Sequence, residues 1–212
     1  MAQLGPLRQD GTAIWVRSDQ GDLADRLDAW LLDREESGEI AQLRTRWLGA
    51  GADPRAASPV SALLAATAER LALMPFVAAA KQRAGKAVED PAQEERVIAA
   101  SATAVATAAR ERRQAPPDRA WVEAFFRAQI EAAKAVQEHA PAPATPAYAL
   151  ETDLRPAIAR ISARMARLAV RVPRGTEPAT VRAEARTDLA STGLDAPQIE
   201  RLAAAVAALA PP

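Results

Sequence analysis

Residues 58–84 read SPVSALLAATAERLALMPFVAAAKQRA, and this stretch decides the fold. Ser58 followed by Pro59 marks a helix start, because a serine side chain caps the first turn and proline fits the first helical position. Apolar residues recur at helical spacing, interrupted by charged residues and by Pro75. The pattern predicts a long, buried amphipathic helix from Pro59 to about Ala84 rather than a membrane span. Pro75 should kink it, because proline removes a backbone donor.

The composition of the 212-residue chain favours helix and excludes several kinds of site. Roughly a quarter of the residues are alanine, the strongest helix former. The charges of the 27 basic and 27 acidic side chains cancel, so the net charge predicts no sequence-independent binding to nucleic acid or to an anionic membrane. Cysteine is absent, and His139 is the single histidine. Disulfides, cysteine nucleophiles and most zinc sites are therefore excluded, and we expect no metal or cofactor.

The pattern changes near residue 55, which indicates a boundary between two parts. Residues 12–17 predict one short strand, and two short helices should follow before the glycine-rich linker at 49–54. We therefore expect an appendage over residues 1–55 and a helical domain over residues 56–212. Besides the helix of residues 59–84, the domain should contain helices over residues 91–114, 119–139, 151–170, 179–191 and 196–209.

Two cations lie on one face of the helix over residues 59–84. Arg70 and Lys81 are eleven residues apart, which is about three whole turns. Cations on a largely apolar face are costly unless they meet an anion, so the pair is a candidate anion site. The alternative is two surface side chains whose aliphatic stems cover apolar surface while their charges reach water.

The start of the next helix holds acidic candidates. Asp90 before Pro91, with Gln93 three residues on, fits a capping box. Glu94, one turn after Asp90, shares its face and is a candidate site residue. The alternative for Glu94 is an ordinary first-turn carboxylate that faces water.

The helix over residues 119–139 carries a polar stripe on alanine-rich surface. Gln129, Ala133 and Gln137 follow one another at intervals of four residues. Each glutamine is either a buried donor or part of a solvated face. The arginines of the helix over residues 151–170, Arg164 among them, fit a solvated face by pattern alone.

Four segments of this region, taken together, resemble the all-helical chorismate mutases. They are residues 68–71 (AERL), 76–81 (FVAAAK), 88–91 (VEDP) and 125–137 (FFRAQIEAAKAVQ). Their order and spacing are most similar to the exported, gamma-type subclass, over residues 58 to 209. The resemblance implies an all-α bundle that isomerises chorismate to prephenate in phenylalanine and tyrosine biosynthesis. It also implies a homodimer.

The implied reaction is a pericyclic rearrangement of one bound molecule, without nucleophile, metal or proton transfer. It needs a dianion held in a compact conformer and a donor for the ether oxygen. By the resemblance, Arg70 and Arg164 bind the two carboxylates. Lys81 contacts a carboxylate and the ether oxygen, and Gln137 donates to that oxygen from the other side.

The remaining implied site residues include two departures from the family pattern. Asp90, through its backbone, and Glu94 hold the ring hydroxyl. Gln93 stands where the family usually has an arginine, and Ala133 where it has a small polar residue. A missing charged contact is worth about 1.5–3 kcal/mol, or roughly tenfold to a hundredfold in rate or affinity. The alternative function is therefore a non-catalytic module of this fold that binds an anionic ligand or a partner.

The N-terminal part has a resemblance of its own. Residues 12–19, 27–32 and 38–49 look like the C-terminal tail of a periplasmic solute-binding-type domain. That fold includes exported cyclohexadienyl (prephenate) dehydratases, so we expect the chain to be the end of a dehydratase–mutase fusion. The alternative is an unrelated helical extension. The expected periplasmic location rests on resemblance, because the first residues carry no apolar core of a signal peptide.

Overall fold

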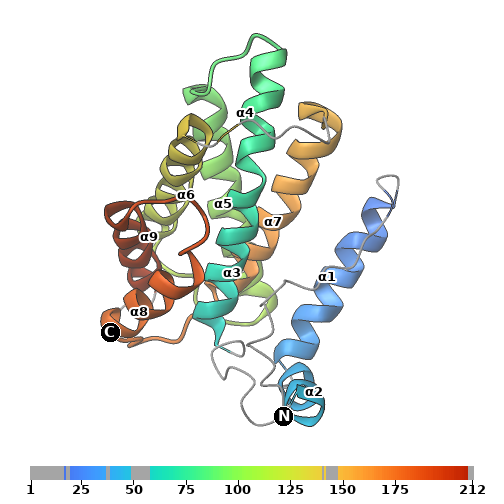
Figure 1. Ribbon diagram of the computed structural model, residues 1–212. Helices are drawn as coiled ribbons and strands as arrows, with labels where there is room; N and C mark the ends of the chain where they lie inside the picture. The colour runs from blue at the N-terminus through green and yellow to red at the C-terminus, as the bar shows by residue number, and fades with distance from the viewer. Residues whose placement is uncertain are drawn as a thin grey trace, which may run out of the picture.

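The computed structural model describes residues 17, 20–36, 39–48, 58–139, 141 and 148–209, and these residues form helices and no strand (Figure 1). The predicted all-α class is confirmed. The strand predicted over residues 12–17 lies, apart from Arg17, outside the described residues. The linker at residues 49–54 and the boundary near residue 55 also lie outside them.

The helices follow the predicted ranges closely. A single turn of π-helix, η2, leads directly into α7. The elements in order are α1 (Gly21–Glu36), α2 (Glu39–Leu48), α3 (Pro59–Ala72), α4 (Met74–Arg83), α5 (Pro91–Glu111), α6 (Arg119–His139), η2 (Leu150–Leu154), α7 (Arg155–Ala169), α8 (Pro178–Asp188) and α9 (Ala196–Ala208).

The long helix predicted from residue 59 is present and is kinked where expected. The Ser58 side chain accepts hydrogen bonds from the backbone N–H groups of Val60 and Ser61, which caps α3. Pro75 cannot donate to the preceding turn, and the helix divides at Leu73 into α3 and α4. By length and composition Pro59–Arg83 could cross a membrane, but half of its most apolar window is buried inside the bundle.

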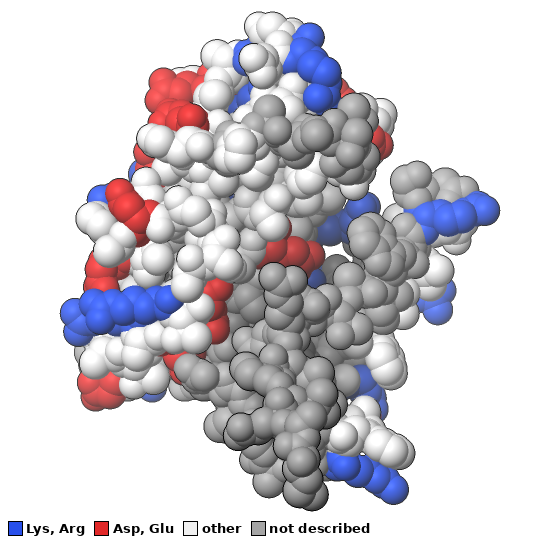
Figure 2. Space-filling model, viewed as in Figure 1, with Lys and Arg blue, Asp and Glu red and all other residues white. Residues whose placement is uncertain are grey.

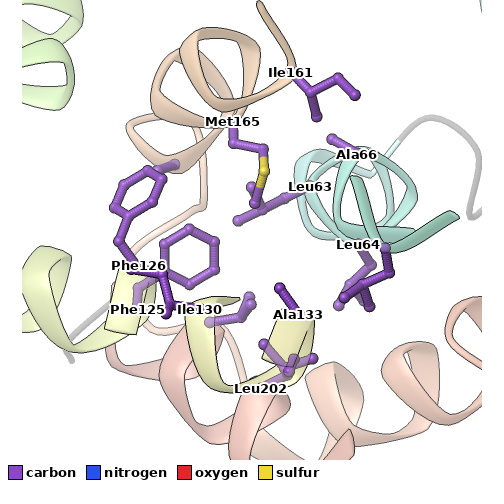
Figure 3. Packing of buried hydrophobic residues seen from close by; sticks show 14 of the residues in the cluster. Leu63, Leu64, Ala66, Phe125, Phe126, Ile130, Ala133, Ile161, Met165 and Leu202 are labelled. Atoms are coloured by element: carbon purple, nitrogen blue, oxygen red, sulfur yellow. The ribbon is translucent and has the colours of Figure 1, made fainter. Parts of the chain in front are cut away.

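The hydrophobic core lies between α3, α6, α7 and α9 (Figure 3). Leu63 and Leu64 of α3, Phe125 of α6, Met165 of α7 and Leu202 of α9 are all almost completely buried. Burial of such side chains is the main favourable term in the folding of a helical bundle. The core therefore fixes the positions of α3, α6 and α7, the helices that carry most of the candidate site residues.

Contacts between the helices define their directions. Arg70 near the end of α3 reaches the Gln129 backbone carbonyl, and Met74 reaches Gln137 eight residues further along α6. Residue numbers increase on both helices from the first contact to the second, so α3–α4 and α6 run in the same direction.

Helices α5 and α7 run the opposite way. Lys81 near the end of α4 feels the charges of Asp90 at the start of α5 and of Arg155 at the start of α7. Further along, Arg164 of α7 is paired with Glu69 of α3. The starts of α5 and α7 therefore meet the end of α4.

The N-terminal helices contact each other and lie at one side of the bundle (Figure 1). They expose two large aromatic side chains, Trp30 at 53% and Trp47 at 74%. On the face shown in Figure 2, basic and acidic side chains are interspersed among uncharged ones, in keeping with the zero net charge.

Candidate active site

A cavity of about 860 Å³ lies between the four long helices α3–α4, α5, α6 and α7. Its walls are mainly apolar, with charged side chains toward the starts of α5 and α7. A cavity of this size and character is typical of a small-molecule site. Six of the seven predicted site residues line it: Arg70, Lys81, Asp90, Gln93, Glu94 and Gln137.

Arg70 lies at the buried end of the cavity wall that α3 and α4 form. Its side chain is 7% exposed, and one terminal nitrogen donates to the Gln129 backbone carbonyl at 3.0 Å. No carboxylate within the described ranges pairs with it. Burial lowers the pKa of Arg70 to about 10, so the guanidinium is still charged near neutral pH. A buried cation that faces a cavity and lacks an anionic partner is suited to bind an anionic group.

A chain of buried hydrogen bonds holds the helix that carries Arg70. The Gln129 side chain, 1% exposed, donates to the Thr67 hydroxyl at 3.1 Å, and this hydroxyl donates to the Leu63 carbonyl at 3.0 Å. The alternative of a buried donor is therefore confirmed for Gln129. Its partner is Thr67 rather than the cavity, so Gln129 fixes α6 against α3 close to Arg70.

Lys81 projects toward the loop between α4 and α5. Its ammonium donates to the Val88 backbone carbonyl at 2.6 Å. Burial lowers the pKa of Lys81 below that of an exposed lysine. The charge of Asp90 opposes this shift, Arg155 adds to it, and Glu94 opposes it. Lys81 is thus a partly desolvated cation placed between groups of both signs.

The start of α5 brings the predicted acidic residues to the cavity. The Asp90 side chain accepts from the Gln93 backbone N–H at 3.0 Å, which confirms Asp90 as the N-cap. The reciprocal bond of a capping box is not made, because the Gln93 side-chain oxygen instead accepts from Arg96 at 2.9 Å. The predicted capping box is therefore wrong for its second hydrogen bond, the one from the Asp90 backbone N–H to the Gln93 side chain.

Glu94 faces the cavity and a lysine rather than open water. Its carboxylate lies 3.6 Å from the ammonium of Lys134 on α6. The same ammonium is 2.7 Å from Glu131, and that hydrogen bond is the main reason why the pKa of Lys134 is raised. Lys134 lines the cavity as well, so Glu94 and Lys134 form a charged pair on its wall.

Gln137 reaches the cavity with a half-satisfied amide. Its nitrogen donates to the Ala133 carbonyl at 3.2 Å and contacts the Met74 sulfur at 3.5 Å. Its side-chain oxygen is buried without a partner in the described part of the chain. Sulfur is a weak hydrogen-bond acceptor, so the Gln137 amide nitrogen can leave Met74 and donate to a ligand that offers a stronger acceptor.

Arg164 is the one predicted site residue that does not line the cavity. Its guanidinium pairs with Glu69 of α3, the residue before Arg70, and Glu69 does not line the cavity either. Arg155, at the first position of α7, lines the cavity instead. Sequence reasoning missed Arg155, although the following proline marks a helix start that meets the end of α4.

Arg155 belongs to a small charged group at the cavity mouth. It lies 2.9 Å from Glu151, which also accepts from Lys86 at 2.8 Å. The Lys86 hydrogen bond is the main cause that lowers the pKa of Glu151. Five basic and three acidic side chains line the cavity in total, so its lining is net positive. They are Arg70, Lys81, Lys86, Lys134 and Arg155, against Glu89, Asp90 and Glu94.

Comparisons with known proteins agree with this geometry. Residues 61–138 match the model of the family described as chorismate mutase type II. A chorismate mutase structure from Burkholderia phymatum has a TM-score of 0.57 and 24% identity, covering 70% of this chain and 95% of that one. One from Burkholderia thailandensis has a TM-score of 0.52 and 26% identity, covering 71% and 98%. No curated protein sequence matches the chain.

The matched region supplies most of the cavity lining, and η2 and α7 supply the rest. The family model spans α3 to α6 and contains every predicted site residue that lines the cavity. The part of the chain that the structure describes holds no group of three or more side chains able to bind a metal ion. Residues 61–138 are therefore similar to the chorismate mutase type II family, over the helices that carry most of the cavity lining.

Proposed function

We propose that the chain is a chorismate mutase, which isomerises chorismate to prephenate in the cavity between α3–α4, α5, α6 and α7. The observation that carries the proposal is Arg70. Its buried guanidinium faces the cavity without an anionic partner among the described residues. Chorismate carries two carboxylates, and one of them supplies the missing anion.

The reaction requires binding and charge stabilisation from the protein rather than covalent chemistry. In one step the ether C–O bond of chorismate breaks and a new C–C bond forms within the same molecule. Negative charge grows on the ether oxygen as the bond breaks. Lys81 is suited to stabilise it, because its ammonium is partly desolvated and its present partner is only the neutral Val88 carbonyl. The Gln137 amide donates to the same oxygen from α6.

The second carboxylate is assigned to Arg155 rather than to Arg164. Arg155 lines the cavity, and its charge acts on Lys81, whereas Arg164 is paired with Glu69 outside the lining. The start of α5 completes the site. Glu94 accepts from the ring hydroxyl, the Asp90 backbone contacts it, and Lys134 balances the charge of Glu94.

Gln93 weakens this site relative to the family pattern. It lines the cavity as a neutral side chain, and Arg96 is turned toward its oxygen. This is the observation that favours the second candidate, a non-catalytic module that binds a dianion. The remaining cations still give the lining a positive balance, so we expect catalysis at a reduced rate.

The finer features of the family resemblance belong to the same proposal. We infer that the chain is of the exported, gamma-type subclass, acts in the periplasm and forms a homodimer, as the resemblance over residues 58–209 implies.

The dehydratase tail is supported by the resemblance of residues 12–49 and by Trp30 and Trp47, which α1 and α2 leave exposed. Light scattering on the purified chain tests the dimer, and fractionation of the cells that express it tests the location.

The proposed activity is tested by following chorismate absorbance with the purified full-length chain. The expected result is a loss that saturates with substrate and scales with protein concentration. Saturable binding of prephenate without any turnover would instead establish the non-catalytic module. Absence of both would exclude chorismate as the ligand of the cavity.

A further inference from the structure

Ser101 is a largely buried serine on the cavity wall whose hydroxyl has no hydrogen-bond partner among the described residues. It lies on α5, its side chain is 6% exposed, and it lines the cavity. Hydroxyls inside helices usually donate to the carbonyl four residues earlier, as Thr103 does to Ala99 on the same helix and Thr67 does to Leu63 on α3. Within the described residues, Ser101 makes neither this bond nor any other.

The Ser101 hydroxyl makes no hydrogen bond that stabilises the described fold. Its oxygen is not among the buried polar atoms that lack a partner, so it keeps some surface open to the cavity. Alanine at the same position would be a better helix former than serine. The Ser101 hydroxyl is therefore available to a ligand in the cavity.

The directions of the helices place Ser101 at the level of Arg70. Lys81 faces Asp90 and Glu94 across antiparallel α4 and α5. Arg70 lies eleven residues before Lys81 on α3–α4. Because α5 runs the opposite way, the matching step on α5 leads eleven residues forward, from 90 to 101 and from 94 to 105. Because all helices rise equally per residue, Arg70 and Ser101 face the same depth of the cavity from opposite walls.

We propose that Ser101 is a substrate-binding residue whose hydroxyl donates to the carboxylate that Arg70 binds. The inference rests on the proposed function and adds a contact from α5 to that site. A hydroxyl that donates to a carboxylate forms a short, charge-assisted hydrogen bond, stronger than a bond between neutral groups.

The test compares Ser101→Ala with the parent chain. We expect the KM for chorismate to rise about tenfold with kcat little changed, because a carboxylate contact exists already in the ground state. The melting temperature of the ligand-free protein should equal or exceed that of the parent, and prephenate should raise it less. The matched control is Thr103→Ala, two residues further along the same helix with an exposed hydroxyl, which should keep the KM of the parent.

Two results would overturn the assignment of Ser101. One is a KM for Ser101→Ala equal to that of the parent. The other is a lowered melting temperature with an unchanged response to prephenate, which is the mark of a structural serine. Failure of the proposed function is read from the parent alone, as absence of both turnover and a prephenate-induced rise in melting temperature. The two failures are therefore distinct.

Discussion

The Lys81 ammonium donates a 2.6 Å hydrogen bond to the backbone carbonyl of Val88, which joins the end of α4 to the loop before α5. This bond holds the cation at the cavity while pairing it only with a neutral acceptor. A carboxylate or a developing oxyanion is a stronger acceptor for an ammonium than a carbonyl. The ligand can therefore take over the Lys81 contact at a net gain.

Replacement of Lys81 by alanine should be the most damaging single change to catalysis. We expect kcat to fall by about a hundredfold or more, because this contact strengthens as charge develops on the ether oxygen. Steady-state kinetics with chorismate provide the measurement. The matched control is Arg83→Ala, an exposed cation two residues further along α4 that donates to the Tyr148 carbonyl. A kcat for Lys81→Ala equal to that of the parent would refute the assignment.

The alkaline limb of the pH–rate profile should respond to Asp90. Lys81 must be protonated to act, its pKa is lowered by burial, and Asp90 is the group that most opposes this shift. Asp90→Asn removes the charge but keeps a good N-cap, so the pKa of Lys81 should fall further. The rate should then decline from a lower pH than in the parent.

Exposed Glu95 offers the control for this experiment. It pairs with Arg127 on the surface, so Glu95→Gln removes a carboxylate of α5 that does not act on Lys81. An alkaline limb that moves equally in both variants, or in neither, would contradict the coupling between Asp90 and Lys81.

Restoration of a cation at Gln93 should raise activity. Gln93→Arg adds positive charge to the cavity lining at the start of α5, and we expect kcat/KM to rise about tenfold. Gln93→Met is the control for charge. Like Gln93→Arg, it removes the hydrogen bond from Arg96 and keeps a long side chain, but it adds no cation. Equal kcat/KM values for the two variants would show that charge at this position is unimportant.

Arg155 and Arg164 should behave differently although both lie on α7. Arg155→Ala should raise KM about tenfold through the loss of a carboxylate contact. Arg164→Ala should change KM by less than about twofold, because its partner Glu69 is half exposed and such pairs contribute about 0–1 kcal/mol. A larger KM effect for Arg164→Ala than for Arg155→Ala would reverse the assignment of the second carboxylate.

Local sequence rules predicted the helices well. Ser58 with Pro59, the kink at Pro75 and the Asp90 cap each depend on a few neighbouring residues, and the structure has all three. Spacing along one helix also placed Arg70 and Lys81 correctly on a common wall of the cavity.

The arrangement of helices around one another was beyond such rules. Arg155 and Arg164 are nine residues apart, or two and a half turns, so they lie on opposite faces of α7 and only one can face the cavity. Nothing within α7 itself indicates which. Gln129 and Gln137 share a stripe, but only contact with Thr67 on α3 distinguishes the structural glutamine from the one at the cavity.

The most direct test of the whole account is turnover of chorismate by the parent chain and by Arg70→Met under identical conditions. The account predicts saturable conversion to prephenate by the parent and at least a hundredfold loss of kcat/KM in the variant. The variant should remain folded, because methionine removes a buried charge but keeps an apolar side chain. A parent no faster than buffer, or an Arg70→Met variant as fast as the parent, would contradict it.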